Sequence, residues 1–136
     1  MRTQDGAGVQ AAAMAGDPAA MIASAESAAP PAVTTNATIK APDGSVLREG
    51  SNGYTCYPGQ PVIGPMCNPP EWEALLAAYG AKQDYQPTGF AVSYMLAGEG
   101  EAIGVSNSQP HHPDPANAED LVKEGPHLMI LVPDAA

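Results

Sequence analysis

The two cysteines constrain this chain more than any other feature of its sequence. Cys56 and Cys67 are the only cysteines among its 136 residues. A disulfide between them would close a loop of about 12 residues, which the chain-entropy model values at roughly 3 kcal/mol of stabilisation. The spacing is not that of a C-x-x-C redox pair, and two cysteines alone do not complete a structural zinc site. The spacing favours a structural disulfide, with a redox-active pair and half of a metal site as alternatives.

The clearest helix follows the second cysteine. Asn68 is a suitable N-cap, Pro69 suits the first helical position, and Glu71 stands three residues after the cap. Gly80 is a suitable stop. The apolar residues between these signals recur at helical spacing, namely Trp72, Leu75, Leu76 and Tyr79. We therefore predict an amphipathic helix over residues 69–79 that packs on one face of a sheet.

A hairpin and a third short strand are expected before the helix. Residues 34–40 and 45–49 have strand composition, and they flank a turn at residues 41–44 with proline and glycine in suitable places. Residues 54–57 form the third short segment and carry Cys56.

The two strongest strands are expected in the second half of the chain. Residues 89–97 alternate, so that one face holds Phe90, Val92, Tyr94 and Leu96. Residues 127–132 form a nearly continuous apolar run, which is typical of a central, buried strand. Between them we expect a long loop over residues 98–117 and one helical turn over residues 118–123.

The N-terminal part is expected to differ from the rest. Residues 1–16 have no hydrophobic period and predict a disordered tail. Residues 17–31 predict an Ala-rich helical arm that begins at Asp17 and serves as a docking arm or an oligomer contact. Residues 32–136 are expected to form a single disulfide-bonded α+β domain. Its sheet would be small and mainly antiparallel, with about four or five strands and one amphipathic helix packed on it.

Composition and charge limit the core and the partners. Val, Ile, Leu and Phe together number only 21 residues, so the core must be small and must rely on the disulfide or on a partner. The net charge is −10, and the five basic residues are scattered. Without a basic cluster, neither nucleic acid nor an anionic membrane surface is an expected partner. No apolar run is long enough for a transmembrane helix, and the chain has no convincing signal peptide.

One strand has the residue types of a soft metal site. His127 and Met129 stand two apart, so both point to one face of a strand. Imidazole and thioether suit copper or a haem iron. Met66 and Met95 are the further candidate ligands. The alternative is that His127 caps a buried strand while the methionines fill the core, and this alternative is favoured. Covalent haem is excluded, since C-x-x-C-H is absent.

A second candidate metal site lies in the long loop. Its ligands would be His111, His112 and Asp114, in a segment stiffened by prolines. The favoured alternative is a solvated polar loop that binds metal ions only adventitiously.

Several motifs together resemble a known group of proteins. They are N-G-Y-T-C at 52–56, P-M-C at 65–67, Y-M-L at 94–96 and P-H-L-M-I at 126–130, with the tryptophan-bearing helix between them. The set resembles a group of uncharacterised exported bacterial proteins, mostly proteobacterial, with the pattern N-G-W-T-C … P-M-C … Y-M-L … P-H-x-M-I. The resemblance covers about residues 29–134. It implies export to the periplasm or the exterior and pairing of Cys56 with Cys67, but no activity.

The chain departs from that pattern in two places. Tyr54 stands where the group usually has tryptophan. Members of the group are also expected to continue after the P-H-x-M-I strand with a further segment containing Gly, aromatic residues and Met. That segment would complete the sheet or a site.

Three classes of function therefore remain open. The first is a non-catalytic secreted or periplasmic binding or accessory protein, including a subunit of a larger assembly, with a protein partner or a second copy bound. The second is a periplasmic protein that handles copper or haem through the His-x-Met strand. The third, a small hydrolase or lyase, has no support from a G-x-S-x-G motif or a phosphate-binding loop.

Overall fold

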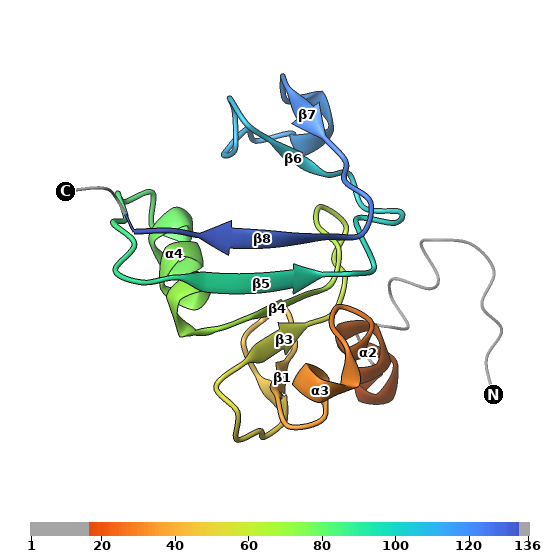
Figure 1. Cartoon of the computed structure of the whole chain (residues 1–136). Coiled ribbons are helices and arrows are strands. Elements are labelled where there is room, and N and C mark those ends of the chain that lie inside the picture. Colours follow the sequence, from red (N-terminus) through yellow and green to blue (C-terminus); the bar gives the residue numbers. More distant parts are fainter. Residues whose placement is uncertain (1–16, 134–136) are drawn as a thin grey trace, which may run out of the picture.

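The computed structural model describes residues 17–133 (Figure 1). The main sheet has six strands in the order β2-β1-β3-β4-β5-β8, and a second sheet pairs β6 with β7. The strands of the main sheet are β1 (Thr38–Lys40), β2 (Val46–Arg48), β3 (Thr55–Tyr57), β4 (Met66–Asn68), β5 (Ala91–Met95) and β8 (His127–Leu131). The other elements are α2 (Pro18–Glu26), α3 (Pro31–Thr34), α4 (Pro70–Gly80), β6 (Val105–Ser106), β7 (Leu121–Val122) and the 3-10 helix η1 (Pro115–Asn117).

The expected α+β class and the mainly antiparallel sheet are confirmed, but the expected number of strands was too low. The hairpin forms as β1 and β2, which pair antiparallel. Strand β3 pairs with the edge of β1 that faces away from β2, and β3 runs parallel to β1. Strand β4 is the missed strand, because three residues between prolines are too short to show a period of two.

Helix α2 packs on the sheet of its own chain rather than standing apart as an arm. Asp17 caps it, since the Asp17 carboxylate accepts a hydrogen bond of 3.1 Å from the Ala19 N–H. Its small residues allow close approach to the strands. The core cluster consists of Ala25, Ala28, Ala29, Ala37, Ile39, Cys56 and Cys67. The expected disordered tail, residues 1–16, lies outside the described residues.

Helix α4 begins one residue later than expected. Its first residue is Pro70 and its N-cap is Pro69, which provides no side-chain cap. Asn68 belongs to β4 instead and is fully buried. Asn68 pairs with Thr55 of β3, and this pairing holds Asn68 in the sheet although its side chain favours a helix N-cap. The Trp72 indole N–H donates to the Ala91 carbonyl over 3.3 Å and ties the helix to β5.

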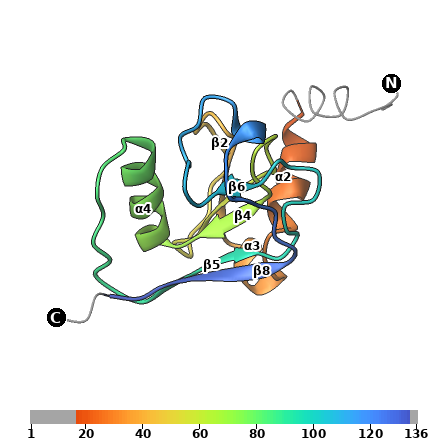
Figure 2. The same cartoon turned by 90° about the horizontal axis from the view of Figure 1, so that it is seen from above.

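The long connection between β5 and β8 also differs from expectation. Residues 121–122 form strand β7 rather than part of a helical turn, and Val122 pairs with Val105 of β6. Figure 2 shows the β6–β7 hairpin and α4 on the same side of the β5–β8 pair. None of the described helices is long and apolar enough to span a membrane.

Candidate functional site

The disulfide between Cys56 and Cys67 is present, as expected. The two residues lie opposite each other in β3 and β4, and both are fully buried in the core cluster. Thiol–disulfide exchange requires access for an attacking thiolate. A bridge buried at the centre of the sheet therefore has the position of a structural link rather than of a redox-active pair.

A polar network that sequence reasoning missed lies between the sheet and α4. The Tyr57 hydroxyl donates to Glu73 Oε1 over 2.6 Å, and the Asn68 side-chain amide donates to Glu73 Oε2 over 3.0 Å. The Ser93 hydroxyl donates to Asn68 Oδ1 over 2.5 Å. The four residues come from three strands and a helix, so no local pattern in the sequence links them. Among the described residues no buried side-chain nitrogen or oxygen atom lacks a hydrogen-bond partner, and the network therefore fixes α4 on the sheet.

Tyr57 makes this network sensitive to alkaline pH. Burial, then the hydrogen bond to Glu73, then the charge of Glu73 raise the pKa of the Tyr57 hydroxyl far above its ordinary value near 10. The unfolded chain therefore loses this proton at a lower pH than the folded chain. The stabilisation is complete below pH 10 and is lost as the pH rises toward the folded-state pKa.

We expect Tyr57→Phe to flatten the pH dependence of stability above pH 10. The wild-type free energy of unfolding should fall there by at most about 1 kcal/mol per pH unit more than that of the variant, since the site is partly exposed. Urea unfolding at pH 8 to 11 measures this difference. Tyr85→Phe, in the loop after α4, is the control and should follow the wild type. Parallel curves for wild type and Tyr57→Phe would contradict the assignment.

The expected central, buried strand is in fact an edge strand. In the described chain β8 pairs only with β5, and its residues alternate between half-buried and exposed. The exposed fractions are 49% for Leu128, 55% for Ile130 and 54% for Val132, with 67% for Phe90, the residue before β5. Position in the sheet depends on the order of strands, which a continuous apolar run does not reveal.

These side chains form one surface. Val92 lies opposite Ile130, and Phe90 and Val132 continue the alternation at the ends of the two strands. We call the surface made by Phe90, Val92, Leu128, Ile130 and Val132 the open apolar face. The Tyr54 and Tyr94 rings, 5.8 Å apart, border it on the side of α2. Contiguous exposed apolar patches on monomeric proteins often mark interaction sites.

The four soft ligands predicted from sequence fall on the other face of the same strands. His127 pairs with Met95, and Met129 lies two residues along β8 from His127. Cys67 pairs with Tyr94, and the antiparallel register continued by one residue sets Met66 opposite Met95. Met66 and Met95 are buried, while His127 and Met129 are half-buried.

The loop residues His111, His112 and Asp114 have other partners. The His111 ring stacks on Tyr79, with the ring centres 4.7 Å apart, and His112 Nδ1 accepts from the Asp114 N–H over 2.9 Å. The Asp114 carboxylate accepts from the Asn117 side chain. Among residues 17–133, no group of three or more His, Cys, Asp or Glu is placed to hold a metal ion. The loop metal site stays a prediction.

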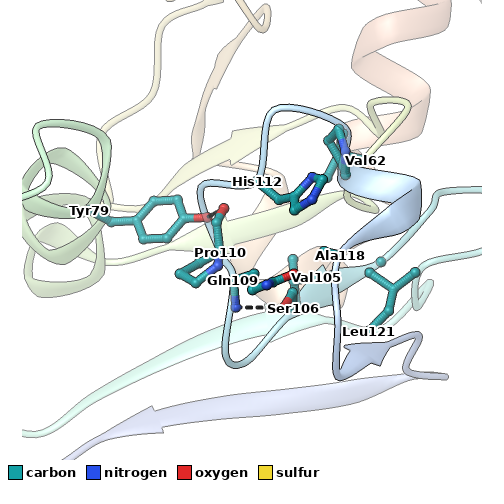
Figure 3. A pocket seen from close by; sticks show the side chains of 11 residues that line it. Val62, Tyr79, Val105, Ser106, Gln109, Pro110, His112, Ala118 and Leu121 are labelled. Carbon is teal, nitrogen blue, oxygen red and sulfur yellow. Dashed lines mark hydrogen bonds between the residues drawn. The ribbon is translucent and has the colours of Figure 1, made fainter.

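A small cavity lies beside this loop (Figure 3). The Tyr79 hydroxyl reaches from α4 to donate to the Pro110 carbonyl over 2.8 Å, and Ser106 of β6 and His112 line the same space. Its volume is about 50 Å³. Substrate pockets usually hold about 300 Å³ or more, so this cavity suits a water molecule rather than a substrate.

Comparison with models of protein families, with curated proteins and with solved structures finds no match to this chain.

Proposed function

We propose that this protein is a non-catalytic binding or accessory protein of the periplasm or the extracellular space. Its partner is an extended segment of another protein. The open apolar face beside the free edge of β8 is the observation that carries the proposal. The buried disulfide supports the compartment, because such bonds persist in oxidising environments.

The combination of an edge and an apolar face favours a polypeptide partner. An edge strand presents unpaired N–H and C=O groups, and an added strand satisfies them while its alternate side chains cover the neighbouring apolar surface. A lipid or a small apolar ligand would cover the face but leave the backbone groups unpaired. A segment that alternates apolar and polar residues meets both requirements.

The charge of this chain indicates which residues should flank the apolar centre of the partner segment. Strands β5 and β8 contain no Asp, Glu, Lys or Arg, whereas the whole chain carries a net charge of −10. The contact itself is therefore neutral, while its surroundings attract cations and repel a second copy of the chain. The expected partner segment has an apolar, alternating centre and Lys or Arg at its flanks.

A synthetic peptide tests this proposal directly. The probe is a fluorescent heptapeptide that alternates valine and threonine between two terminal lysines, titrated with the full chain at low salt. We expect saturable binding, about tenfold weaker or worse when glutamates replace the lysines. The double variant Leu128→Thr/Ile130→Thr should bind about 10 to 100 times more weakly, because it removes apolar contact without changing charge or strand propensity.

Val46→Thr is the matched control. Val46 is 47% exposed on β2, the strand at the opposite edge of the same sheet, and its replacement should leave peptide binding unchanged. Equal affinity for a peptide of the same composition with its valines contiguous would overturn the proposal. So would a stable dimer of the free chain that Leu128→Thr/Ile130→Thr dissociates, since a second copy would then occupy the face.

A further inference from the structure

Four residues with soft ligand side chains lie on one face of the sheet, opposite the open apolar face. Met66, Met95 and His127 form a row across β4, β5 and β8, and neighbouring strands lie about 4.8 Å apart. The backbones of Met66 and His127 are therefore about 10 Å apart, with Met95 between them. Met129 stands about 7 Å further along β8. Each methionine side chain is unbranched and has three rotatable bonds, so its thioether can turn toward a point between the strands.

The histidine is held in a form that suits a metal ligand. His127 Nδ1 lies 2.6 Å from the Gly125 carbonyl oxygen. A carbonyl only accepts hydrogen bonds, so Nδ1 carries a proton, and in the neutral ring the lone pair is then on Nε2. Metal-bound histidines are commonly oriented by such a bond from the other ring nitrogen. The Gly125 carbonyl would thus hold the His127 ring in a fixed orientation for metal binding.

The backbone around Gly125 is itself closely fixed. The buried Glu99 carboxylate accepts from the Gly64 N–H over 2.9 Å, and the Glu99 N–H donates to the Glu124 carbonyl over 2.9 Å. A Cβ on Gly98 would lie 2.8 Å from the Gly125 carbonyl carbon, so only glycine allows this approach. Three loop segments are thereby joined at the end of the sheet where His127 lies.

We propose that this chain binds one monovalent soft cation, Cu(I), through His127 Nε2 and the thioethers of Met95, Met129 and Met66. Thioether and imidazole ligands select Cu(I), whereas Mg²⁺, Ca²⁺ and Mn²⁺ prefer carboxylate oxygens. All four side chains approach from one face of one sheet, which fits a single ion and not the two opposite faces of a haem. The site lies on the opposite side of the sheet from the open apolar face, so it does not depend on the proposed partner.

Silver(I) is the first probe, because it mimics Cu(I) and needs no reductant to keep its oxidation state. The full chain, labelled with ¹³C at its six methionine methyl groups, is titrated with silver nitrate and then with Cu(I) in ascorbate. We expect one ion per chain. The methyl signals of Met66, Met95 and Met129 should shift, while those of Met1, Met14 and Met21 should not.

Substitutions separate this site from adventitious binding. Met129→Leu, Met95→Leu and His127→Ala should each weaken binding about tenfold or more, because each removes one ligand. Leucine nearly conserves the volume of methionine, so the two leucine variants should still fold. Met21→Leu, a buried methionine of α2, and His112→Ala, in the loop, are the matched controls and should bind as wild type does. Equal affinity of Met129→Leu and wild type, or methyl shifts confined to other methionines, would overturn the proposal.

Discussion

Replacing Cys56 and Cys67 together by alanine is expected to lower the free energy of unfolding by about 3 to 5 kcal/mol. About 3 kcal/mol follows from releasing the closed loop, and the remainder follows from lost packing, since both residues are fully buried in the core cluster. A domain with so few large apolar residues is expected to have a small free energy of unfolding, so this loss is a large part of it. Urea unfolding followed by the fluorescence of Trp72, the single tryptophan, measures the loss.

The reduced wild type is the control for packing. Wild-type chains unfolded with a reductant present should lose about 3 kcal/mol relative to oxidised chains. The alanine double variant should not respond to the reductant. A double variant whose unfolding midpoint in urea matches that of the oxidised wild type would show that the bridge adds nothing to the fold.

Gly64→Ala is expected to cost about 3 kcal/mol or more. A Cβ at this position would collide with the Gly98 carbonyl oxygen and lie 2.9 Å from its carbon, and both are backbone atoms that cannot rotate away. The shift needed to relieve the clash would also lengthen the Gly64–Glu99 hydrogen bond and leave a buried carboxylate without its donor. Thermal and urea unfolding of the purified variant measure this cost.

Gly80→Ala is the matched control for that substitution. Gly80 ends α4, and a Cβ added there would meet nothing within 4 Å. Alanine also has the higher helix propensity, so this variant should be as stable as wild type or slightly more stable. If Gly64→Ala and Gly80→Ala unfolded at the same urea concentration, the close approach of residues 64 and 98 would be refuted.

Local signals in the sequence predicted the features that depend on neighbouring residues. The alternation at 89–97, the proline–glycine turn of the hairpin and the helical spacing after Cys67 each depend on a few adjacent side chains, and each appears in the structure. The disulfide was predictable because Cys56 has only one possible partner within the chain. His127 and Met129 were placed on one face of a strand by alternation alone.

Features that depend on distant residues were not predictable in the same way. The parallel pairing of β1 with β3 and the edge position of β8 are properties of strand order. Asn68 has the local pattern of a helix cap, yet the sheet holds it because Ser93 and Glu73 supply partners from other elements. No periodicity in the sequence records such contacts, and the contact of Gly64 with Gly98 is hidden for the same reason.

The place of β8 in the chain also shapes how the molecule assembles. Its only partner in the described sheet is β5, from which residues 96–126 separate it, whereas the other antiparallel pairs join strands closer together in sequence. In a chain that emerges from a ribosome or a translocation pore, the other five described strands of the main sheet therefore precede β8. Until then the outer edge of β5 is unpaired, and we expect closure of the long connection to be the slowest pairing in this sheet, because it has the largest entropic cost. Newly made chains are expected to be most prone to aggregation during that interval.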